Sequence, residues 1–373
     1  MELTFEREEL WEAMQIAGNV AASRNTLPIL SNVLIKTVNN HIQLAATDLE
    51  VGVKSAVQGE IVEAGSITVP AKKLVDIVRE LPAAKVKLTT LANDRVEINC
   101  ESANFKIVGL TDEEFPPLPE IGDDFFVMKS SVLRRMIQKT SFAVSTEETR
   151  HFLNGVYLNV TPDAIKMVAT DGRRLAVATQ NQPHSVEKEI GVIIPTKAIN
   201  NILRTFTADE DVKIALLENQ IAFATENITL ISRLIEGEYP DYTAVMAPVI
   251  SNEIELIAET EHLLSVIRRV SLLANPNTPS IRIEYKDNAV TVSASTPELG
   301  EAREQMQVKT SGGNVEIAFN ARFIMDVLRN IDSDDVLLKF RDSLSPVLVQ
   351  PSKGEESEED KQDYMCVIMP MRV

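Results

Sequence analysis

The best isolated candidate for an active-site acid is Asp171, in the segment Thr170-Asp171-Gly172-Arg173-Arg174. A positioned carboxylate can act as a general acid or base, as an α+β hydrolase would require. A counterpart, Thr47-Asp48-Leu49, stands earlier in the chain. Because aspartate side chains often close turns, a structural turn explains both segments, and the recurrence favours structure over catalysis.

Other catalytic signatures are absent from the sequence. There is no Gly-rich phosphate loop, His-Glu-x-x-His, Gly-x-Ser-x-Gly or Cys-x-x-Cys segment, and none of the four histidines has another within ligand-like spacing. The two cysteines, Cys100 and Cys366, are far apart, which argues against a disulfide framework and a cysteine zinc site. We therefore expect no catalytic residue, no cofactor, no metal site and a reducing compartment.

The elements that must position these residues occur in three similar copies. Each copy opens with a helical pattern, at 5–20, 129–140 and 261–273. A strand and a turn segment follow, and a second helix then begins after an apolar strand. The second helices are expected at 70–81, 195–206 and 320–331, where Pro70, Pro195 and Asn320 serve as start signals spaced 125 residues apart.

Alternating strands follow each second helix, such as Val86–Leu88 with Val96–Ile98 in the first copy. Helices separated by antiparallel strands, rather than strict βαβ alternation, predict the α+β class. The repeat predicts three domains, at 1–123, 124–248 and 249–373.

Charge is distributed unevenly along the 373 residues. Lys and Arg number 37 against 55 Asp and Glu, a net charge of −18, which excludes nucleic-acid binding through the overall field. The six predicted helices nevertheless sum to +6. In the second copy, Arg135 and Lys139 are four residues apart and share a helix face. We expect a basic face within an acidic protein, suited to holding DNA by its phosphates without reading bases.

Apolar residues are sufficient for buried cores but not for a membrane span. They make up 44% of the chain, and no apolar run approaches 18 residues. The first residues also lack a basic region followed by a long apolar one. We therefore expect a soluble, cytoplasmic protein with no membrane partner.

The full length of the chain resembles the bacterial sliding clamps, the beta subunits of DNA polymerase III. No single segment is specific, but five occur in order on the three-copy chain. These segments are Arg24–Leu30, Phe152–Gly155, Ala169–Val177, Tyr239–Tyr242 and Val367–Val373.

The resemblance implies three tandem clamp-type domains, each with two helices on antiparallel sheets, in a homodimer whose two subunits close head to tail into a ring. Twelve helices would line a hole around duplex DNA, which the ring contacts without sequence specificity. The implied function is non-catalytic: the clamp tethers the replicative DNA polymerase and confers processivity, after an ATP-driven loader has opened the ring. The missing phosphate loop agrees, because hydrolysis belongs to the loader.

The resemblance also implies a hydrophobic cleft between the second and third domains, which binds short peptides of polymerases, loader and repair proteins. Apolar, adaptable side chains near the end of the sequence are consistent with peptide recognition. A last strand that completes the core explains Val367 and Ile368 equally well. By motif match the cleft comprises Leu153, Thr170, Gly172, Arg173, Arg174, Leu175, Pro240, Val245, Met246, Asn320, Phe323, Leu344, Pro346, Val367, Ile368, Met369, Pro370, Met371 and Arg372.

Candidate DNA contacts come from loops and from helices. Arg24, Arg150 and His151 match loops that the family turns towards DNA. The helix charges add Lys72, Lys73, Arg135, Lys139, Lys197 and Arg204. At the subunit interface the resemblance implies packing of Leu272 and Leu273, with Glu298, Glu301 and Glu304 nearby.

Some positions depart from the family's pattern. Ala244 and Pro346 replace residues that are often basic and small polar, respectively, so we expect a different peptide preference. Segment 101–104 lacks the basic residues that can face the acidic edge of the third domain. Segment 354–360 extends a usually short turn with acidic residues, and we expect a disordered loop there.

Two other functions remain open on the sequence alone. One is a peptide-binding scaffold of duplicated domains that never meets DNA, which fits the acidic total and the apolar C-terminal segment. The other is the hydrolase built on Asp171. Retention on circular duplex DNA separates the clamp from the scaffold, and turnover of an Asp171→Asn variant tests the hydrolase.

Overall fold

The computed structural model describes residues 1–22, 27–181, 189–286, 288–352 and 362–372. Arg24 and the acidic segment 354–360 lie outside the described residues. In the described part, one order of elements occurs three times: a strand, a helix, four or five strands, a second helix and three strands. The predicted three-copy α+β fold is therefore confirmed.

The bounds of the elements follow the three copies. The first copy comprises β1 (Glu2–Glu6), α1 (Arg7–Val20), η1 (Pro28–Ser31), β2 (Asn32–Val38), β3 (His41–Thr47), β4 (Val51–Val57), β5 (Glu60–Glu63), β6 (Ser66–Pro70), α2 (Ala71–Glu80), β7 (Lys85–Leu91), β8 (Arg95–Cys100) and β9 (Ala103–Val108). The second comprises β10 (Phe126–Lys129), α3 (Ser130–Ser141), η2 (Glu148–Leu153), β11 (Gly155–Val160), β12 (Ala164–Thr170), β13 (Arg174–Asn181), β14 (Ile190–Pro195), α4 (Thr196–Thr205), β15 (Asp211–Leu216), β16 (Gln220–Ala224) and β17 (Ile228–Arg233). After α5 (Thr243–Ile250), the third comprises β18 (Ile254–Glu259), α6 (Thr260–Val270), η3 (Ser271–Leu273), β19 (Ser280–Lys286), β20 (Ala289–Thr296), β21 (Gly300–Gln307), β22 (Lys309–Ser311), β23 (Val315–Asn320), α7 (Ala321–Leu328), β24 (Asp335–Phe340), β25 (Val347–Pro351) and β26 (Gln362–Ile368).

Four sheets carry the fold, and two of them join neighbouring copies. Their strand orders are β5-β1-β7-β8-β9, β10-β15-β16-β17-β4-β3-β2-β6, β14-β11-β12-β13-β26-β25-β24-β18-β22 and β21-β20-β19-β23. In both joined sheets the last strand of one copy pairs antiparallel with the fourth strand of the copy before it, as β17 with β4 and β26 with β13. In the described part of the chain, the corresponding strands β9 and β21 are sheet edges.

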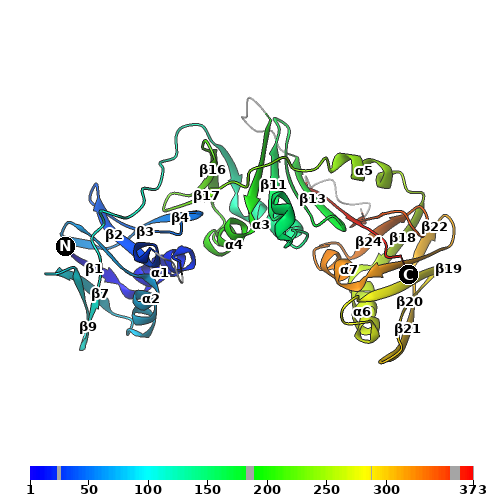
Figure 1. Ribbon diagram of the computed structural model, residues 1–373, viewed down its shortest axis with the longest axis horizontal. Coiled ribbons are helices and arrows are strands. Elements are labelled where there is room, and N and C mark those ends of the chain that lie inside the picture. Colours follow the sequence, from blue (N-terminus) through cyan, green and yellow to red (C-terminus); the bar gives the residue numbers. More distant parts are fainter. Residues whose placement is uncertain (23–26, 182–188, 287, 353–361, 373) are drawn as a thin grey trace. The chain divides into compact units, whose positions relative to one another are not determined.

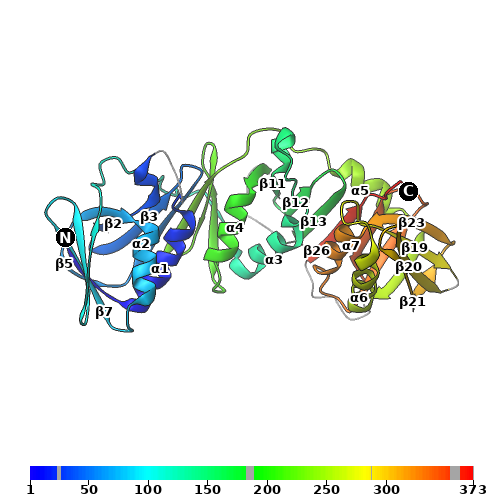
Figure 2. The ribbon, with the colours of Figure 1, turned by 60° about the horizontal axis from the view of Figure 1, so that its bottom comes forward.

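In the first and third copies the two helices pack side by side over the strands of their copy. In the first copy α1 contacts α2, β3 and β4, and in the third α6 contacts α7 and β20 (Figures 1 and 2). Helix α1 buries Leu10, Met14 and Ala17, whose helical spacing forms one apolar face. Arg7 ties α1 to α2, because its Nε donates to the carbonyl of Val78 at 3.1 Å.

Several predicted element bounds needed correction. The first helix begins at Arg7 rather than at residue 5, because residues 2–6 form β1 and pair with β7. Pro70 and Pro195 are not the first helical residues; Pro70 closes β6 before α2, and Pro195 closes β14 before α4. Asn320 does cap its helix, with its side chain accepting from the N–H of Arg322 at 3.0 Å.

Helix α5 was not anticipated, and the domain boundary predicted at residue 248 falls within it. Pro248 lies within the last turn of α5, where the loss of one N–H affects few helical hydrogen bonds. The helix buries Met246 and Val249, so tertiary packing compensates for the proline.

The described chain forms two compact units, residues 1–134 with 197–234 and residues 135–196 with 235–373. Each unit holds one of the joined sheets. The units follow strand pairing between copies, whereas the boundaries at 123 and 248 follow the repeat, so those boundaries stay a prediction.

Candidate functional site

The segment around Asp171 is a turn closed by its own side chains. The Oδ1 of Asp171 accepts from the N–H groups of Arg173 and Arg174 at 2.9 and 3.0 Å. Thr170 Oγ1 donates to the Arg174 carbonyl at 2.7 Å and accepts from the Gly172 N–H at 3.0 Å. Gly172 has φ +84°, which glycine adopts without strain.

The first copy builds the same turn. Asp48 Oδ1 accepts from the N–H groups of Glu50 and Val51 at 3.0 and 2.9 Å. Thr47 Oγ1 donates to the Val51 carbonyl and accepts from the Leu49 N–H. Leu49 has φ 76° although it lacks the conformational freedom of glycine. The structural interpretation of both aspartates is confirmed.

Arg174 connects the second-copy turn to α7. Its Nε donates to Asp171 at 3.0 Å, its Nη1 to Asp326 at 2.7 Å and its Nη2 to the Phe142 carbonyl at 2.6 Å. Its guanidinium also lies 4.5 Å from the ring centroid of Phe323. The side chain is only 11% exposed, so these partners replace its hydration and hold the turn against α7.

A pocket of about 430 Å³ opens beside this arginine. It offers charged groups, hydroxyls and two aromatic rings. Its lining residues are Ser141, Phe142, Val144, Ser145, Thr146, Glu147, Asp171, Arg173, Arg174, Thr196 and Phe323.

An apolar cluster forms the centre of the candidate cleft. Its buried members come from β12, β13, α5, β25 and β26, and they are Val168, Leu175, Val177, Met246, Val249, Leu348 and Val367. The half-buried side chains of Tyr157, Tyr239, Tyr242, Val245 and Met365 pack against them. The structure thus brings together four predicted residues, Leu175, Val245, Met246 and Val367.

The tyrosines of this cluster were not among the predicted residues. The rings of Tyr157 and Tyr239 stack with centroids 4.8 Å apart and planes 8° apart, and Tyr242 lies 6.4 Å from Tyr157. Burial raises the pKa of the Tyr239 hydroxyl far above its ordinary value. The segment Tyr239–Tyr242 stood out in the sequence, but its pairing with β11 had no local signal.

The other predicted cleft residues surround this cluster in different environments. Leu153 and Ile368 are buried core residues, while Gly172, Arg173, Pro240, Leu344 and Arg372 are exposed. Half-buried residues are Thr170, Asn320, Phe323, Pro346, Met369, Pro370 and Met371. Val367 and Ile368 lie in β26, so they complete the core, and Val367 also joins the cleft cluster.

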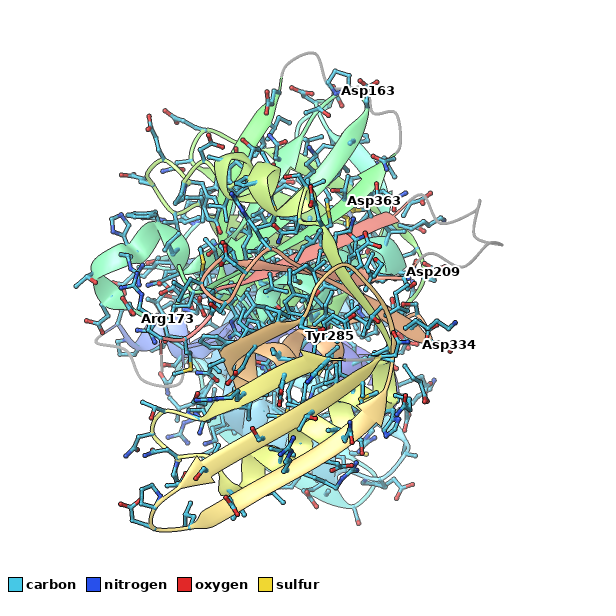
Figure 3. The ribbon with its side chains drawn as sticks, turned by 90° about the vertical axis from the view of Figure 1, so that its right-hand side faces the viewer. Asp163, Arg173, Asp209, Tyr285, Asp334 and Asp363 are labelled. Atoms are coloured by element: carbon cyan, nitrogen blue, oxygen red, sulfur yellow. The ribbon has the colours of Figure 1, made fainter. Side chains whose placement is uncertain are left out.

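The chain after β26 is held by two backbone hydrogen bonds, one to the turn before β13 and one to β23. The Met369 N–H donates to the Arg173 carbonyl at 2.9 Å, and the Met371 N–H donates to the Ala318 carbonyl at 2.7 Å. Figure 3 labels Arg173, which lies in the turn between β12 and β13.

Most predicted DNA contacts on the helices are exposed. Lys72 and Lys73 project from α2, and Arg204 projects from α4. Lys197, at the start of α4, is exposed but ion-paired with Asp48 and with Glu50, the latter at 2.7 Å.

Lys139 shares a helix face with Arg135, as predicted, because both bind Asp332, but the expected exposed basic face does not include Lys139. Lys139 is only 6% exposed, and its Nζ lies 2.9 Å from Asp332 and 5.1 Å from the ring centroid of Tyr364. Arg135 binds the same carboxylate at 2.9 Å but stays 39% exposed. The long lysine stem packs into the protein while its charge meets Asp332.

The loop candidates differ from each other. Arg150 pairs with Glu147 at 2.6 Å and donates to the Asp171 carbonyl at 3.4 Å, so it supports the turn. His151 is exposed and meets the ring of Phe152 edge-on, with centroids 5.8 Å apart.

The predicted interface residues lie on η3, β21 and the turn before β21. Leu272 is 75% exposed, Leu273 is half-buried, and Glu298 and Glu301 are exposed. Glu304 already binds Arg269 at 2.5 and 2.9 Å, and these hydrogen bonds lower the pKa of its carboxyl.

The described residues contain neither a cluster that could hold a metal ion nor a helix that could cross a membrane. No group of three or more His, Cys, Asp or Glu side chains is placed to hold a metal ion. Among the described helices, none is long and apolar enough to cross a membrane.

Comparisons with known proteins cover all three copies. Family models of the DNA polymerase III beta subunit match residues 1–119 (N-terminal domain), 127–241 (central domain) and 250–372 (C-terminal domain). The beta sliding clamp of Chlamydia muridarum is 32% identical over 376 residues, which cover 100% of this chain and 99% of that protein. The beta sliding clamp of Pseudomonas aeruginosa is 34% identical over 376 residues and is covered completely, as is this chain.

Solved structures give the same result. The crystal structure of the DNA polymerase III subunit beta from Pseudomonas aeruginosa has a TM-score of 0.92 at 32% identity, with full coverage of both chains. A sliding clamp from Bartonella birtlesii bound to griselimycin has a TM-score of 0.92 at 33% identity, again with full coverage of both.

Proposed function

The chain belongs to the DNA polymerase III beta subunit family, the beta sliding clamps, and from this premise we propose that two copies close head to tail around duplex DNA. The family works with DNA polymerase and DNA, and it is non-enzymatic. The chain is a sliding clamp that supports processive synthesis. The proposal concerns how this chain closes, what it contacts and which partners it docks.

Strand pairing between copies carries the proposal for ring closure. The last strand of the second copy pairs with the fourth strand of the first, and the third copy pairs with the second in the same way. In the described part of the chain, only the third copy's fourth strand, β21, and the first copy's last strand, β9, lack this partner. We propose that β21 of one subunit pairs with β9 of another subunit, so that the same pairing rule closes a head-to-tail dimer.

The observed registers predict the register of this interface. Gly52, the residue opposite Thr47, pairs with Ile231, and the corresponding Leu175 pairs with Val367. Gly300 is the corresponding residue in the third copy, because it pairs with Thr296. Lys106 precedes Ile231 by 125 residues and is its equivalent in the first copy. We therefore expect Gly300 of one subunit to lie opposite Lys106 of the other subunit, and Arg303 opposite Ala103.

Exposed apolar side chains at these edges support the same proposal. Val108 on β9 is 62% exposed and Leu272 beside β21 is 75% exposed. Unpaired edges with exposed apolar residues tend to associate. Pairing of β9 with β21 would cover both.

The interface charges also follow the repeat. Lys197 at the start of α4 binds the turn of the preceding copy through Asp48 and Glu50. Lys72 is its equivalent, 125 residues earlier. We propose that Lys72 binds Glu298 and Glu301 of the other subunit, in addition to its expected role near DNA.

We propose that the remaining cations hold DNA through phosphates alone, which permits sliding because no base is read. These residues are Arg24, Lys73, Arg135, Arg150, His151, Lys197 and Arg204. Lys139 contributes indirectly, by holding Asp332 and thereby positioning Arg135.

We propose that the apolar cluster and its surrounding residues bind short peptides of replicative and repair polymerases and of an ATP-driven loader, in the cytoplasm. The cluster offers adaptable methionines and stacked tyrosines beside charged groups, which suits peptide recognition. The Bartonella birtlesii clamp binds griselimycin. We expect this chain to bind griselimycin at the same cluster.

Retention on DNA tests the proposal. After loading onto a nicked circular plasmid with a clamp loader and ATP, the wild-type protein should co-elute with DNA in gel filtration and leave once the plasmid is cut. Lys73→Glu with Arg135→Glu should reduce retention, whereas the exposed control Lys286→Glu should not. Equal loss from circular and cut DNA contradicts the proposal, and unchanged retention in the double variant favours contacts elsewhere.

A further inference from the structure

A second groove lies in the third copy along the outer edge of β23. It has a volume of about 1010 Å³ and runs between this strand, the start of β18 and the loop at 341–344. Its walls combine apolar side chains, Ile254, Ile317 and Leu344, with three cations, Arg282, Arg341 and Arg372. Figure 3 shows the four-stranded sheet that ends in β23, with Tyr285 of the neighbouring strand β19 labelled.

The backbone of β23 offers hydrogen bonds on this side. One edge of the strand pairs with β19. On the other, the carbonyl of Ala318 accepts from the Met371 N–H at 2.7 Å. Because alternate residues of a strand direct their backbone groups to the same side, Glu316 directs its N–H and carbonyl to this edge too. Within the described residues, no backbone group pairs with Glu316 there.

The charges of the groove favour an acidic occupant. Glu316 pairs with Arg282 at 2.6 Å. The Asp342 carboxylate accepts from the N–H groups of Leu344 and Ser345, and these bonds hold its pKa below the ordinary value. Both acids are therefore engaged locally. Arg341 and Arg372 are exposed, and neither forms a salt bridge among the described residues, although the charge of Arg341 also helps to lower the pKa of Asp342.

We propose that this groove binds an extended, acidic segment of a partner protein, which adds as a strand to the edge of β23. Its main chain pairs with Glu316, an apolar side chain packs on Leu344, which is 68% exposed, and carboxylates meet Arg341 and Arg372. Leu344 and Arg372 also belong to the proposed cleft, so the inference rests on the proposed function in that one partner peptide can run through both sites.

A synthetic peptide that alternates valine with aspartate or glutamate tests this groove alone. Fluorescence anisotropy should show saturable binding to the full-length protein. Arg341→Glu should weaken binding about fivefold or more, because an attractive charge becomes repulsive. Glu316→Pro should abolish it by removing the outward N–H, which an edge strand tolerates. Lys286→Glu, a matched charge reversal on β19, should bind as the wild type does.

Hydrogen exchange and three control ligands complete the test. The amide of Glu316 should exchange more slowly when the peptide is bound. A lysine version of the peptide and an oligothymidylate of similar charge should bind at least tenfold more weakly. No binding at millimolar peptide, equal binding to Arg341→Glu, or equal binding of the oligothymidylate overturns the inference. Griselimycin binding is measured on the same samples, so failure of the cleft proposal is distinguished from failure of this one.

Discussion

Nη1 of Arg174 lies 2.7 Å from Oδ2 of Asp326, which joins a second-copy turn to a third-copy helix. The first copy makes an analogous contact with the charges exchanged. Here the acid, Asp48, lies in the turn, and the base, Lys197, lies on the helix of the following copy. The first and second copies therefore use the same turn to hold the second helix of the copy that follows. This ionic contact accompanies the strand pairing that joins the copies.

Arg174→Lys should destabilise the protein although the charge is kept. A single ammonium cannot reach Asp171, Asp326 and the Phe142 carbonyl together, and it does not stack as a guanidinium does. We expect a loss of about 2 kcal/mol in the free energy of unfolding, measured by urea titration. The exposed neighbour is the control: Arg173→Lys should change it by less than about 0.5 kcal/mol. Equal effects of the two variants would show that the contacts of Arg174 contribute nothing.

Asp332→Asn should destabilise the protein in a pH-dependent way. Burial raises the pKa of the Asp332 carboxyl, but hydrogen bonds and charges from Lys139 and Arg135 outweigh this effect and hold the pKa below its ordinary value. A lowered folded-state pKa stabilises the fold above the unfolded value and loses this effect as the pH falls through the folded value. The variant should therefore be less stable than wild type from pH 5 to 8, by about 1–3 kcal/mol because Lys139 is left buried without its partner.

The difference between wild type and Asp332→Asn should shrink as the pH falls through the lowered pKa of Asp332. Thermal unfolding of both proteins across this range measures it. Glu316→Gln, which removes one carboxylate of an exposed ion pair, is the control and should show little difference at any pH. A constant difference down to pH 2 would contradict this account of Asp332.

Tyr239→Ala should weaken griselimycin binding, because it removes one ring of the stacked pair in the cleft cluster. We expect about a tenfold rise in Kd by isothermal titration calorimetry. Tyr239→Phe keeps the stack and removes only a hydroxyl whose bond to the Val168 carbonyl is 3.5 Å long, so its Kd should stay near the wild-type value. If Tyr239→Ala binds as wild type does, the cluster is not the binding site.

Both cysteines should resist alkylation in the folded protein. Burial raises the pKa of the Cys366 thiol to about 12, and burial together with Glu101 raises that of Cys100. Since the thiolate is the reactive form, iodoacetamide at pH 8 should label neither residue in the native state and both in concentrated urea. Mass spectrometry counts the adducts, and rapid labelling of native Cys366 would show that β26 opens readily.

The repeat and much of the cleft were predictable from sequence for a physical reason. Pro70, Pro195 and Asn320 each stand directly before a helix and are local signals, and the recurring Thr-Asp turns satisfy their backbone groups from within a few residues. Such features need no knowledge of distant segments. Leu175 and Val367 could be linked only through the family resemblance, although they face each other in adjacent strands.

The misplaced features depend on distant partners. Helix periodicity placed Lys139 beside Arg135 but could not show that its ammonium group is buried. The ammonium of Lys139 binds Asp332, which is 197 residues from Arg135 in the sequence. Tyr157 gave no signal because its stacking partner, Tyr239, comes from another element. Helix α5 forms despite Pro248 because its apolar face packs on the cleft cluster. In each case packing between elements decided the outcome.

A covalently closed ring gives the most direct test of the central claim, that two copies close through β9 and β21 around DNA. A variant carrying Ala103→Cys and Arg303→Cys is loaded onto a circular plasmid and cross-linked with a short bismaleimide, which the buried native thiols should not reach. Dimers linked at both interfaces should stay with the circle through hot detergent and separate from it only after the plasmid is cut. Release of fully cross-linked dimers from uncut circles, or failure of the two cysteines to cross-link, would contradict the account.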